Sequence, residues 1–157
     1  MSYILAAIMW LAPQLGHTKI AEYGKIIAFE ARWYAVEPAD ILTVITHESR
    51  WYRYKKSPTN DYGLMQVHVA RRGSARFLGR EKELYDPRTN IREGTRLMAM
   101  WKNYHNRVCK NDDAHTYLAH LKWGKVVKNK ERHTNMERLR AFLLQKFWLK
   151  PVVAMTD

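Results

Sequence analysis

The stretch that decides the fold is PADILTVITHES, which runs from Pro38 to Ser49. Proline suits the first position of a helix, and Asp40 falls in the first turn, where the helix dipole favours an acid. The residues that follow place four side chains on one face at helical spacing: Ile41, Val44, Ile45 and Glu48. The stretch therefore predicts a helix whose apolar face carries an acid near its C-terminal end.

Glu48 is the unusual residue of this helix. It continues the apolar stripe, so it should point towards the interior, and it lies near the helix C-terminus, where the dipole disfavours an anion. Both effects favour the neutral carboxyl and predict a raised pKa, which a general acid for glycosidic cleavage requires. Periodicity alone supports equally a buried structural Glu that is satisfied by an arginine or by backbone donors.

Helical patterns also dominate the rest of the chain. Apolar residues recur near the helical period from Thr18 to Tyr34. The segment from Met1 to Pro13 is apolar, lacks Lys and Arg, and predicts a first helix packed on the core, with an export signal as the alternative. Asn90 and Glu93 have the spacing of a capping box, which predicts that a long amphipathic helix begins there. Gly94 lies on the apolar face of that helix, where it would allow another helix to pack closely.

Two further helices are expected towards the C-terminus. Asp112 or Asp113 would cap a short helix that ends at Gly124. A second capping box, TNME from Thr134, opens a last helix within residues 125–150, and residues 151–157 form a tail without a pattern.

The middle of the chain has weaker signals. Lys55 to Tyr62 is expected to be a polar loop or turn, and Tyr62 to Val69 either a short strand or the start of a helix. Arg71 to Pro87 connects this part to the long helix. The fold class is therefore mainly α, a single compact domain over residues 1–157 with at most a small β-sheet or hairpin near residues 55–68.

Composition limits the function without naming it. The 157 residues include 27 Lys and Arg against 15 Asp and Glu, and this net charge of +12 attracts polyanions, whether nucleic acid, anionic lipid or an acidic wall polymer. The single cysteine, Cys109, excludes an intramolecular disulfide. No segment is long enough to cross a membrane as an ordinary helix. Nucleic acid is not expected as the main partner, because no groove-reading motif accompanies the charge.

Ordered motifs around Glu48 carry a resemblance to a known family. The Glu48-Ser49 pair is followed, fifteen positions after Glu48, by GLMQ at residues 63–66, then by LYDP at 84–87 and NIREG at 90–94. This order resembles the soluble lytic transglycosylase (SLT) family of the lysozyme-like superfamily, and Ser57 falls where that family usually has a serine. The resemblance covers about residues 23–124.

The resemblance implies a substrate and a mechanism. Glu48 would protonate the glycosidic oxygen between N-acetylmuramic acid and N-acetylglucosamine in peptidoglycan. As a base it would then take the proton of the muramic C6 hydroxyl, which closes a 1,6-anhydro ring. Met65 and Gln66 would line the sugar cleft, and neither a metal nor a cofactor is expected. The alternative is a structural role for both residues. Met65 would then fill space in the core, and Gln66 would be a buried amide with local hydrogen-bond partners.

The match departs from the family near its end. Where the family has a Tyr and an Asn, this chain has Leu121 and Lys122. Tyr117, one turn earlier, is the candidate to replace the tyrosine that normally bonds the acid. Lys122 would bind an acidic part of the substrate or lower the pKa of Glu48, and Trp123, like Trp51, is a cleft candidate by position. The alternative is a divergent helix end without a role.

Asp61 is the second departure. The segment NDYGLMQ from Asn60 to Gln66 is similar to animal-type lysozymes, in which such a segment carries a second carboxylate, and to small transglycosylases of secretion systems. A second carboxylate permits hydrolysis, with Asp61 as nucleophile or ion stabiliser. The alternative for Asp61 is an Asx turn.

Other functions remain possible interpretations of the same sequence. A non-catalytic wall-binding module would share the fold, and a muramidase would share the acid. His47-Glu48 is not a metalloprotease motif, because position 51 is Trp51 rather than His. The site of action is expected to be the periplasm or cell wall. A phage particle, an exported enzyme and a secretion-system component all fit, and the export route stays open.

Overall fold

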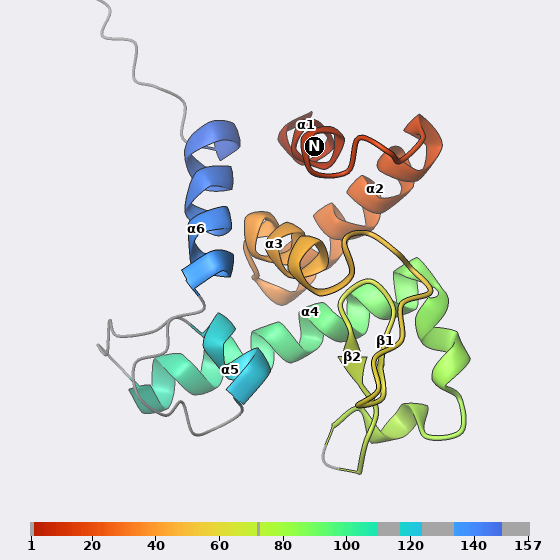
Figure 1. Ribbon diagram of the computed structural model, residues 1–157. Coiled ribbons are helices and arrows are strands. Elements are labelled where there is room, and N and C mark those ends of the chain that lie inside the picture. Colours follow the sequence, from red (N-terminus) through yellow and green to blue (C-terminus); the bar gives the residue numbers. More distant parts are fainter. Residues whose placement is uncertain (1, 72, 110–116, 124–133, 149–157) are drawn as a thin grey trace, which may run out of the picture.

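The computed structural model describes residues 2–71, 73–109, 117–123 and 134–148. A small β-hairpin lies at one side of the helices, next to α4 (Figure 1). The α-helices are α1 (Ser2–Leu11), α2 (His17–Tyr34), α3 (Pro38–Ser49), α4 (Pro87–Tyr104), α5 (Leu118–Trp123) and α6 (Thr134–Leu143). The strands are β1 (Asp61–Tyr62) and β2 (Val67–His68), followed by the 3₁₀ helices η1 (Ala75–Phe77) and η2 (Glu81–Tyr85). Single π-turns, η3 (His105–Cys109) and η4 (Leu144–Trp148), continue α4 and α6. The fold is mainly α and lysozyme-like, as expected.

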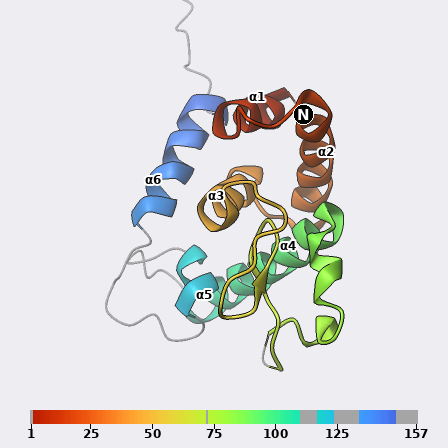
Figure 2. The same cartoon turned by 45° about the vertical axis from the view of Figure 1, so that its right-hand side comes forward.

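Helix α3 lies among the other helices. Its seven consecutive residues from Ala39 to Ile45 are all buried, so the first two turns are covered on every side. Both views show α3 between α1, α2 and α6, and it packs on each of them (Figures 1 and 2). Pro38 is at the helix start, as its fixed φ favours. The acid-bearing helix is therefore held by the main hydrophobic core.

A tight chain reversal ends α3. Arg50 and Trp51 both have left-handed backbone, with φ of 52° and 68°. The Ser49 hydroxyl donates to the Ile45 carbonyl at 3.1 Å and accepts from the Trp51 amide at 3.1 Å, so it ties the last turn of α3 to the reversal that follows. Trp51 was a cleft candidate, and that interpretation is wrong: it is 4% exposed and stacks on Tyr23 in the core.

The region from Tyr62 to Val69 is neither one strand nor the start of a helix. It forms a tight hairpin, in which Asp61 pairs with His68 and Tyr62 with Val67. Gly63 and Gln66 both have positive φ, 77° and 47°. Gly63 is required twice, by this conformation and because an added Cβ would lie 2.8 Å from the Asn90 side-chain Cγ.

Helix α4 begins four residues earlier than the capping-box interpretation predicted, because that interpretation placed the N-cap at Asn90. Asp86 is the N-cap and accepts from the Thr89 amide at 2.8 Å, and Pro87 is the first helical residue. The prediction failed because Asn90 has tertiary partners instead. Its amide donates to the carbonyls of Tyr62 and Leu84, at 2.7 and 2.9 Å, and its oxygen accepts from the Met65 amide at 2.8 Å.

Gly94 allows α4 to approach the hairpin turn closely, whereas the sequence predicted that it would allow close packing of a helix. A Cβ at Gly94 would lie 2.8 Å from the Met65 Cβ, closer than real side chains come. The second prediction for this helix, that Glu93 belongs to a capping box, is wrong. Glu93 is fully buried and bonds Ser74, Arg76 and Arg96.

The ends of the chain agree with the prediction where they are described. Helix α1 packs Ile4, Ala7 and Ile8 into the core. Within the described residues, the last helix is α6, which begins at Thr134 and passes into η4 at Leu144, and residues 125–133 of the predicted segment lie outside them. The predicted caps at Asp112, Asp113 and Gly124, and the tail after residue 150, lie outside the described residues.

Candidate active site

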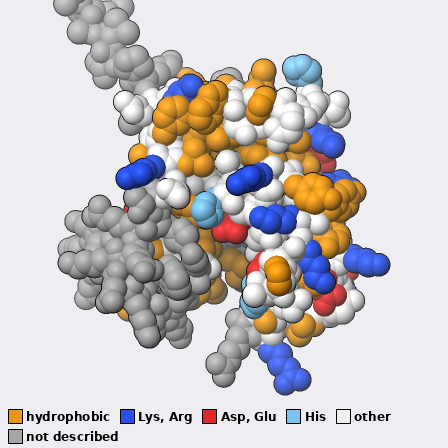
Figure 3. Space-filling model, in the orientation of Figure 1, with side chains coloured by type: hydrophobic (Ala, Val, Ile, Leu, Met, Phe, Trp, Pro, Cys, Tyr) orange, Lys and Arg blue, Asp and Glu red, His pale blue; other side chains and the backbone are white. Residues whose placement is uncertain are grey.

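A cavity of about 750 Å³ opens at the C-terminal end of α3. Its lining comes from α3, the hairpin region, α4 and α5, and includes Val44, His47, Glu48, Thr59, Asp61, Met65, Gln66, Val67, His68, Gly73, Gly94, Leu97, Met98, Met100, Trp101 and Leu121. Near the centre of this face, acidic and histidine side chains lie next to each other at the surface (Figure 3). A cavity of this volume suits a ligand of a few sugar rings.

Glu48 reaches the cavity from the last turn of α3 and is partly exposed. The ammonium of Lys55 donates to the Glu48 backbone carbonyl. A cation at a helix C-terminus offsets the negative end of the helix dipole, which by itself disfavours an anionic side chain there. Glu48 therefore lies in the wall of the cavity rather than deep in the core. The Lys55 ammonium at its backbone carbonyl was not predicted from the sequence.

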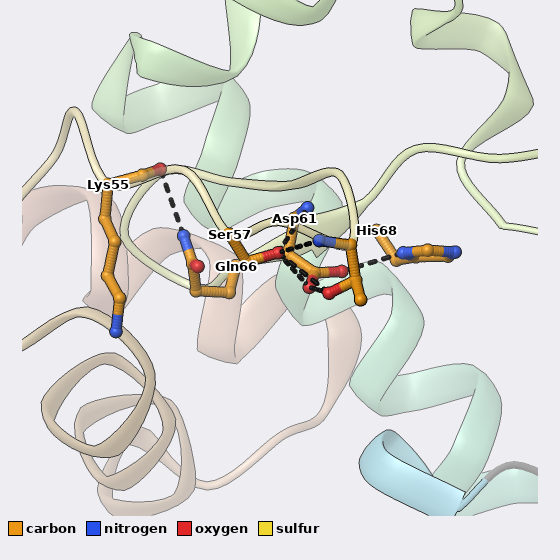
Figure 4. A network of polar contacts seen from close by, with 6 residues as sticks. Lys55, Ser57, Asp61, Gln66 and His68 are labelled. Atoms are coloured by element: carbon orange, nitrogen blue, oxygen red, sulfur yellow. Dashed lines mark hydrogen bonds and ion pairs between the residues drawn. The ribbon is translucent and has the colours of Figure 1, made fainter.

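Asp61, on β1, also lines the cavity and is held by three side chains. Its Oδ2 accepts from Ser57 Oγ at 2.5 Å and from Thr59 Oγ1 at 2.6 Å, and its Oδ1 lies 2.7 Å from His68 Nδ1 (Figure 4). His68 is its partner across the hairpin, where side chains of opposed residues meet. Its carboxylate oxygens are thus taken up by these side chains rather than by an Asx turn.

The same contacts set the charge of Asp61. Burial opposes ionisation, but the hydrogen bonds from Ser57, Thr59 and His68, with the charge of His68, outweigh it and lower the pKa of Asp61. Asp61 is therefore an anion in the cleft at neutral pH.

Met65 and Gln66 both line the cavity from the hairpin turn. The Gln66 amide donates to the carbonyls of Lys55 and Gly63, at 3.1 and 2.9 Å, so its nitrogen is fixed. Met65 is buried against Gly94. The GLMQ motif thus shapes one wall of the cleft through its backbone as well as its side chains.

The remaining predicted site residues, and Leu121 at the departure from the family pattern, have different positions. Ser57 acts on Asp61 and is absent from the described lining. Tyr117 is buried and its hydroxyl donates to Asp40 Oδ2 at 2.5 Å, so the interpretation that it replaces the family tyrosine beside Glu48 is not supported. Leu121 lines the cavity from α5. Lys122 and Trp123 belong to α5, and their side chains lie outside the described residues.

Four residues of the site were missed by sequence reasoning. Thr59 and His68 hold Asp61, Lys55 bonds the helix end, and Trp101 lines the cavity from α4. The register of the hairpin would have paired His68 with Asp61, had the hairpin been assigned. Trp101 has only the spacing of a core residue, and no local signal distinguishes it.

The described residues contain neither a metal-binding cluster nor a membrane-spanning helix. Within these ranges, no three His, Cys, Asp or Glu side chains gather closely enough to hold a metal ion. In the same part of the chain, every helix is too short or too polar to cross a membrane.

A mainly helical domain, in which a glutamate at the end of the central helix and a small hairpin line the same cavity, is typical of the lysozyme-like class. A model of the family described as "Transglycosylase SLT domain" matches residues 25–133, which is more than half of the chain. The chain belongs to this family.

One curated relative is similar over part of its length. It is the membrane-bound lytic murein transglycosylase E of Buchnera aphidicola subsp. Acyrthosiphon pisum (strain APS), 36% identical over 83 residues. These residues are 48% of this chain and 38% of the relative, so the match spans less than two thirds of the relative's length. No solved structure matches the chain significantly.

Proposed function

We propose that this protein is a peptidoglycan lytic transglycosylase that cleaves the β-1,4 bond between N-acetylmuramic acid and N-acetylglucosamine. The observation that carries the proposal is Glu48, which faces a glycan-sized cavity at the end of α3 within a family-matched segment. The name of the relative points to the same chemistry.

In this mechanism Glu48 acts twice. It first donates its proton to the glycosidic oxygen, and the positive charge that develops on the muramic residue is relieved by that sugar's acetamido oxygen. Glu48, now a carboxylate, then takes the proton of the C6 hydroxyl, whose oxygen closes the 1,6-anhydro ring. Met65 and Gln66 bind and orient the sugars, and Trp101 offers a ring on the α4 side.

Asp61 supports a second candidate, a lysozyme-type hydrolase. An anion in the same cavity as Glu48 would stabilise the cationic transition state or act as a nucleophile. Water would then replace the C6 hydroxyl, and the new muramic end would be reducing.

The decisive experiment is mass spectrometry of peptidoglycan digested by the purified protein. Anhydro-muramic ends support the transglycosylase, and reducing muramic ends support the hydrolase. Glu48→Gln should lower product release about a hundredfold or more, because the general acid is lost. Glu37→Gln is the matched control, since Glu37 is exposed just before the same helix and makes no side-chain cap bond.

A second pair of variants separates the two candidates. If Asp61 serves hydrolysis, Asp61→Asn removes reducing ends and leaves anhydro ends. Asp86→Asn is the control, because asparagine also caps helices well. Full activity of Glu48→Gln would overturn both candidates, and binding of cell walls without cleavage by the wild type would favour a non-catalytic module.

The proposed substrate places the action in the periplasm or cell wall. Peptidoglycan strands are the proposed partner, and a phage particle or a secretion system is the proposed setting.

A further inference from the structure

The loop after α3 exposes two aromatic side chains, Tyr52 and Tyr54, and the half-buried Tyr85 at the end of η2 contacts Tyr54; these three residues are called the tyrosine strip. Tyr52 is 61% and Tyr54 49% exposed, although tyrosine rings are usually buried in large part. The centroids of Tyr52 and Tyr54 are 6.1 Å apart, and those of Tyr54 and Tyr85 are 5.6 Å apart, both pairs edge to face. Tyr85 in turn contacts the buried Tyr62, which anchors the strip.

Cations lie within this strip. The guanidinium carbon of Arg53 is 4.4 Å from the centre of the Tyr54 ring, and Arg53 also donates to the Tyr54 hydroxyl. The Lys56 ammonium lies 5.4 Å from the centre of the Tyr62 ring. Hydrophobic side chains stand among Lys and Arg on the side of the molecule where this loop lies (Figure 3). The strip thus combines ring surface with positive charge.

The loop that carries Tyr52 and Tyr54 is tied to the wall of the cavity through Lys55. Lys55 lies between Tyr54 and Lys56. Its ammonium donates to the Glu48 backbone carbonyl, and its own backbone carbonyl accepts from the Gln66 side-chain amide at 3.1 Å. Glu48 and Gln66 both line the cavity. One short loop therefore presents Tyr52 and Tyr54 to solvent while its backbone is fixed to the cleft.

We infer that the tyrosine strip is an accessory binding surface for the part of a glycan strand that extends beyond the cavity, with Arg53 and Lys56 pairing with carboxylates of its stem peptides. The inference rests on the proposed function. The cavity, at about 750 Å³, holds only a few sugars of a long polymer, so the rest of the strand must lie elsewhere. Aromatic faces pack well on sugar rings, and the acidic stems complement the cations.

The test measures binding of the full chain to purified, insoluble sacculi by co-sedimentation. Every protein carries Glu48→Gln, so that strands are not cut during the measurement. Adding Tyr52→Ala and Tyr54→Ala should weaken binding about tenfold, because two ring contacts are lost. The matched control is Phe29→Ala with Trp33→Ala. This pair is also stacked and exposed, at 57% and 72%, but lies on α2 outside the described lining of the cavity, and its loss should leave binding unchanged.

Each other result overturns the inference in a recognisable way. If the tyrosine variant binds sacculi as tightly as the control, the strip is not a glycan surface, while cleavage by the wild type would still uphold the proposed function. If the tyrosines matter equally for vesicles of phosphatidylglycerol, the strip binds anionic lipid instead. If no protein binds sacculi and the wild type releases no fragments, the proposed function fails together with the inference.

Discussion

Glu93 shows how one buried carboxylate holds a surface loop onto a helix. It is fully buried on α4, and its oxygens accept from Ser74 at 2.7 Å and from Arg96 at 2.9 Å, with Arg76 as a third partner. Burial opposes its ionisation, but the hydrogen bonds from Arg96 and Ser74 and the charges of Arg96 and Arg76 outweigh it, so the pKa of Glu93 is lowered. A lowered pKa means that the folded state favours the anion.

We therefore expect Glu93 to make stability depend on acid. Its contribution is fully present above the ordinary Glu pKa of 4.5 and is lost as the pH falls through the lowered folded value. Glu93→Gln should lower the unfolding free energy at pH 7 and flatten its fall below about pH 4.5, as urea titrations at several pH values would measure. Glu83→Gln, a change in an exposed pair with Arg80, should alter stability by less than about 1 kcal/mol. An unchanged pH profile for Glu93→Gln would contradict this role.

At the scale of elements, one buried carboxylate joins three helices. Asp40, in the first turn of α3, accepts from Tyr117 just before α5 and from Arg140 of α6. Burial and the charge of Asp40 raise the pKa of Tyr117, so its hydroxyl stays a donor. Because α5 carries Leu121 to the cavity, this contact also sets one cleft wall.

Removing that carboxylate should loosen α5 and α6 from α3. Asp40→Ala leaves a partly buried arginine and a buried hydroxyl without their acceptor, and should cost about 3–5 kcal/mol in unfolding free energy. Tyr117→Phe removes a single donor and should cost about 1–3 kcal/mol. Chemical denaturation checks the order of the two variants, and hydrogen exchange should show faster opening of α5 and α6 in Asp40→Ala. The reverse order would contradict the proposed joint.

Elements with a long apolar period were predictable from sequence, and contacts between elements were not. Pro38 and its stripe located α3 because both signals are local. Asn90 was misassigned because its partners, Tyr62 and Met65, lie 28 and 25 residues earlier in the chain. Short strands carry too few residues for a period, so the hairpin was recognised only as a region.

The candidate site shows the same division. Motifs led to Glu48, Asp61, Met65 and Gln66, and the structure places all four around one cavity. Trp51 and Tyr117 were misassigned because nearness in sequence to a motif does not decide which way a ring points. Tyr23 and Asp40, their partners, come from other helices.

At the scale of the whole molecule, the net charge of +12 predicts salt-sensitive binding to an acidic wall. Long-range attraction between exposed charges is screened within about 10 Å at 0.1 M salt and about 3 Å at 1 M salt. Raising the salt over this range should weaken binding of the Glu48→Gln protein to sacculi severalfold in co-sedimentation. Binding that does not respond to salt would mean that contacts within the cleft, rather than overall charge, dominate.

The elements that carry the two carboxylates of the cleft pack on different hydrophobic clusters. Glu48 ends a helix of the main core, whereas the strands beside Asp61 lie on a separate cluster of Tyr62, Val67, Val69, Phe77 and Leu84. Asp61 and His68 form the outer pair of the hairpin, away from the turn that enters the main core. Mutation can therefore remodel that outer pair while leaving the acid's support intact. If Asp61 serves hydrolysis, as proposed, substitutions in the hairpin would change the product while the helix that carries Glu48 stays unchanged.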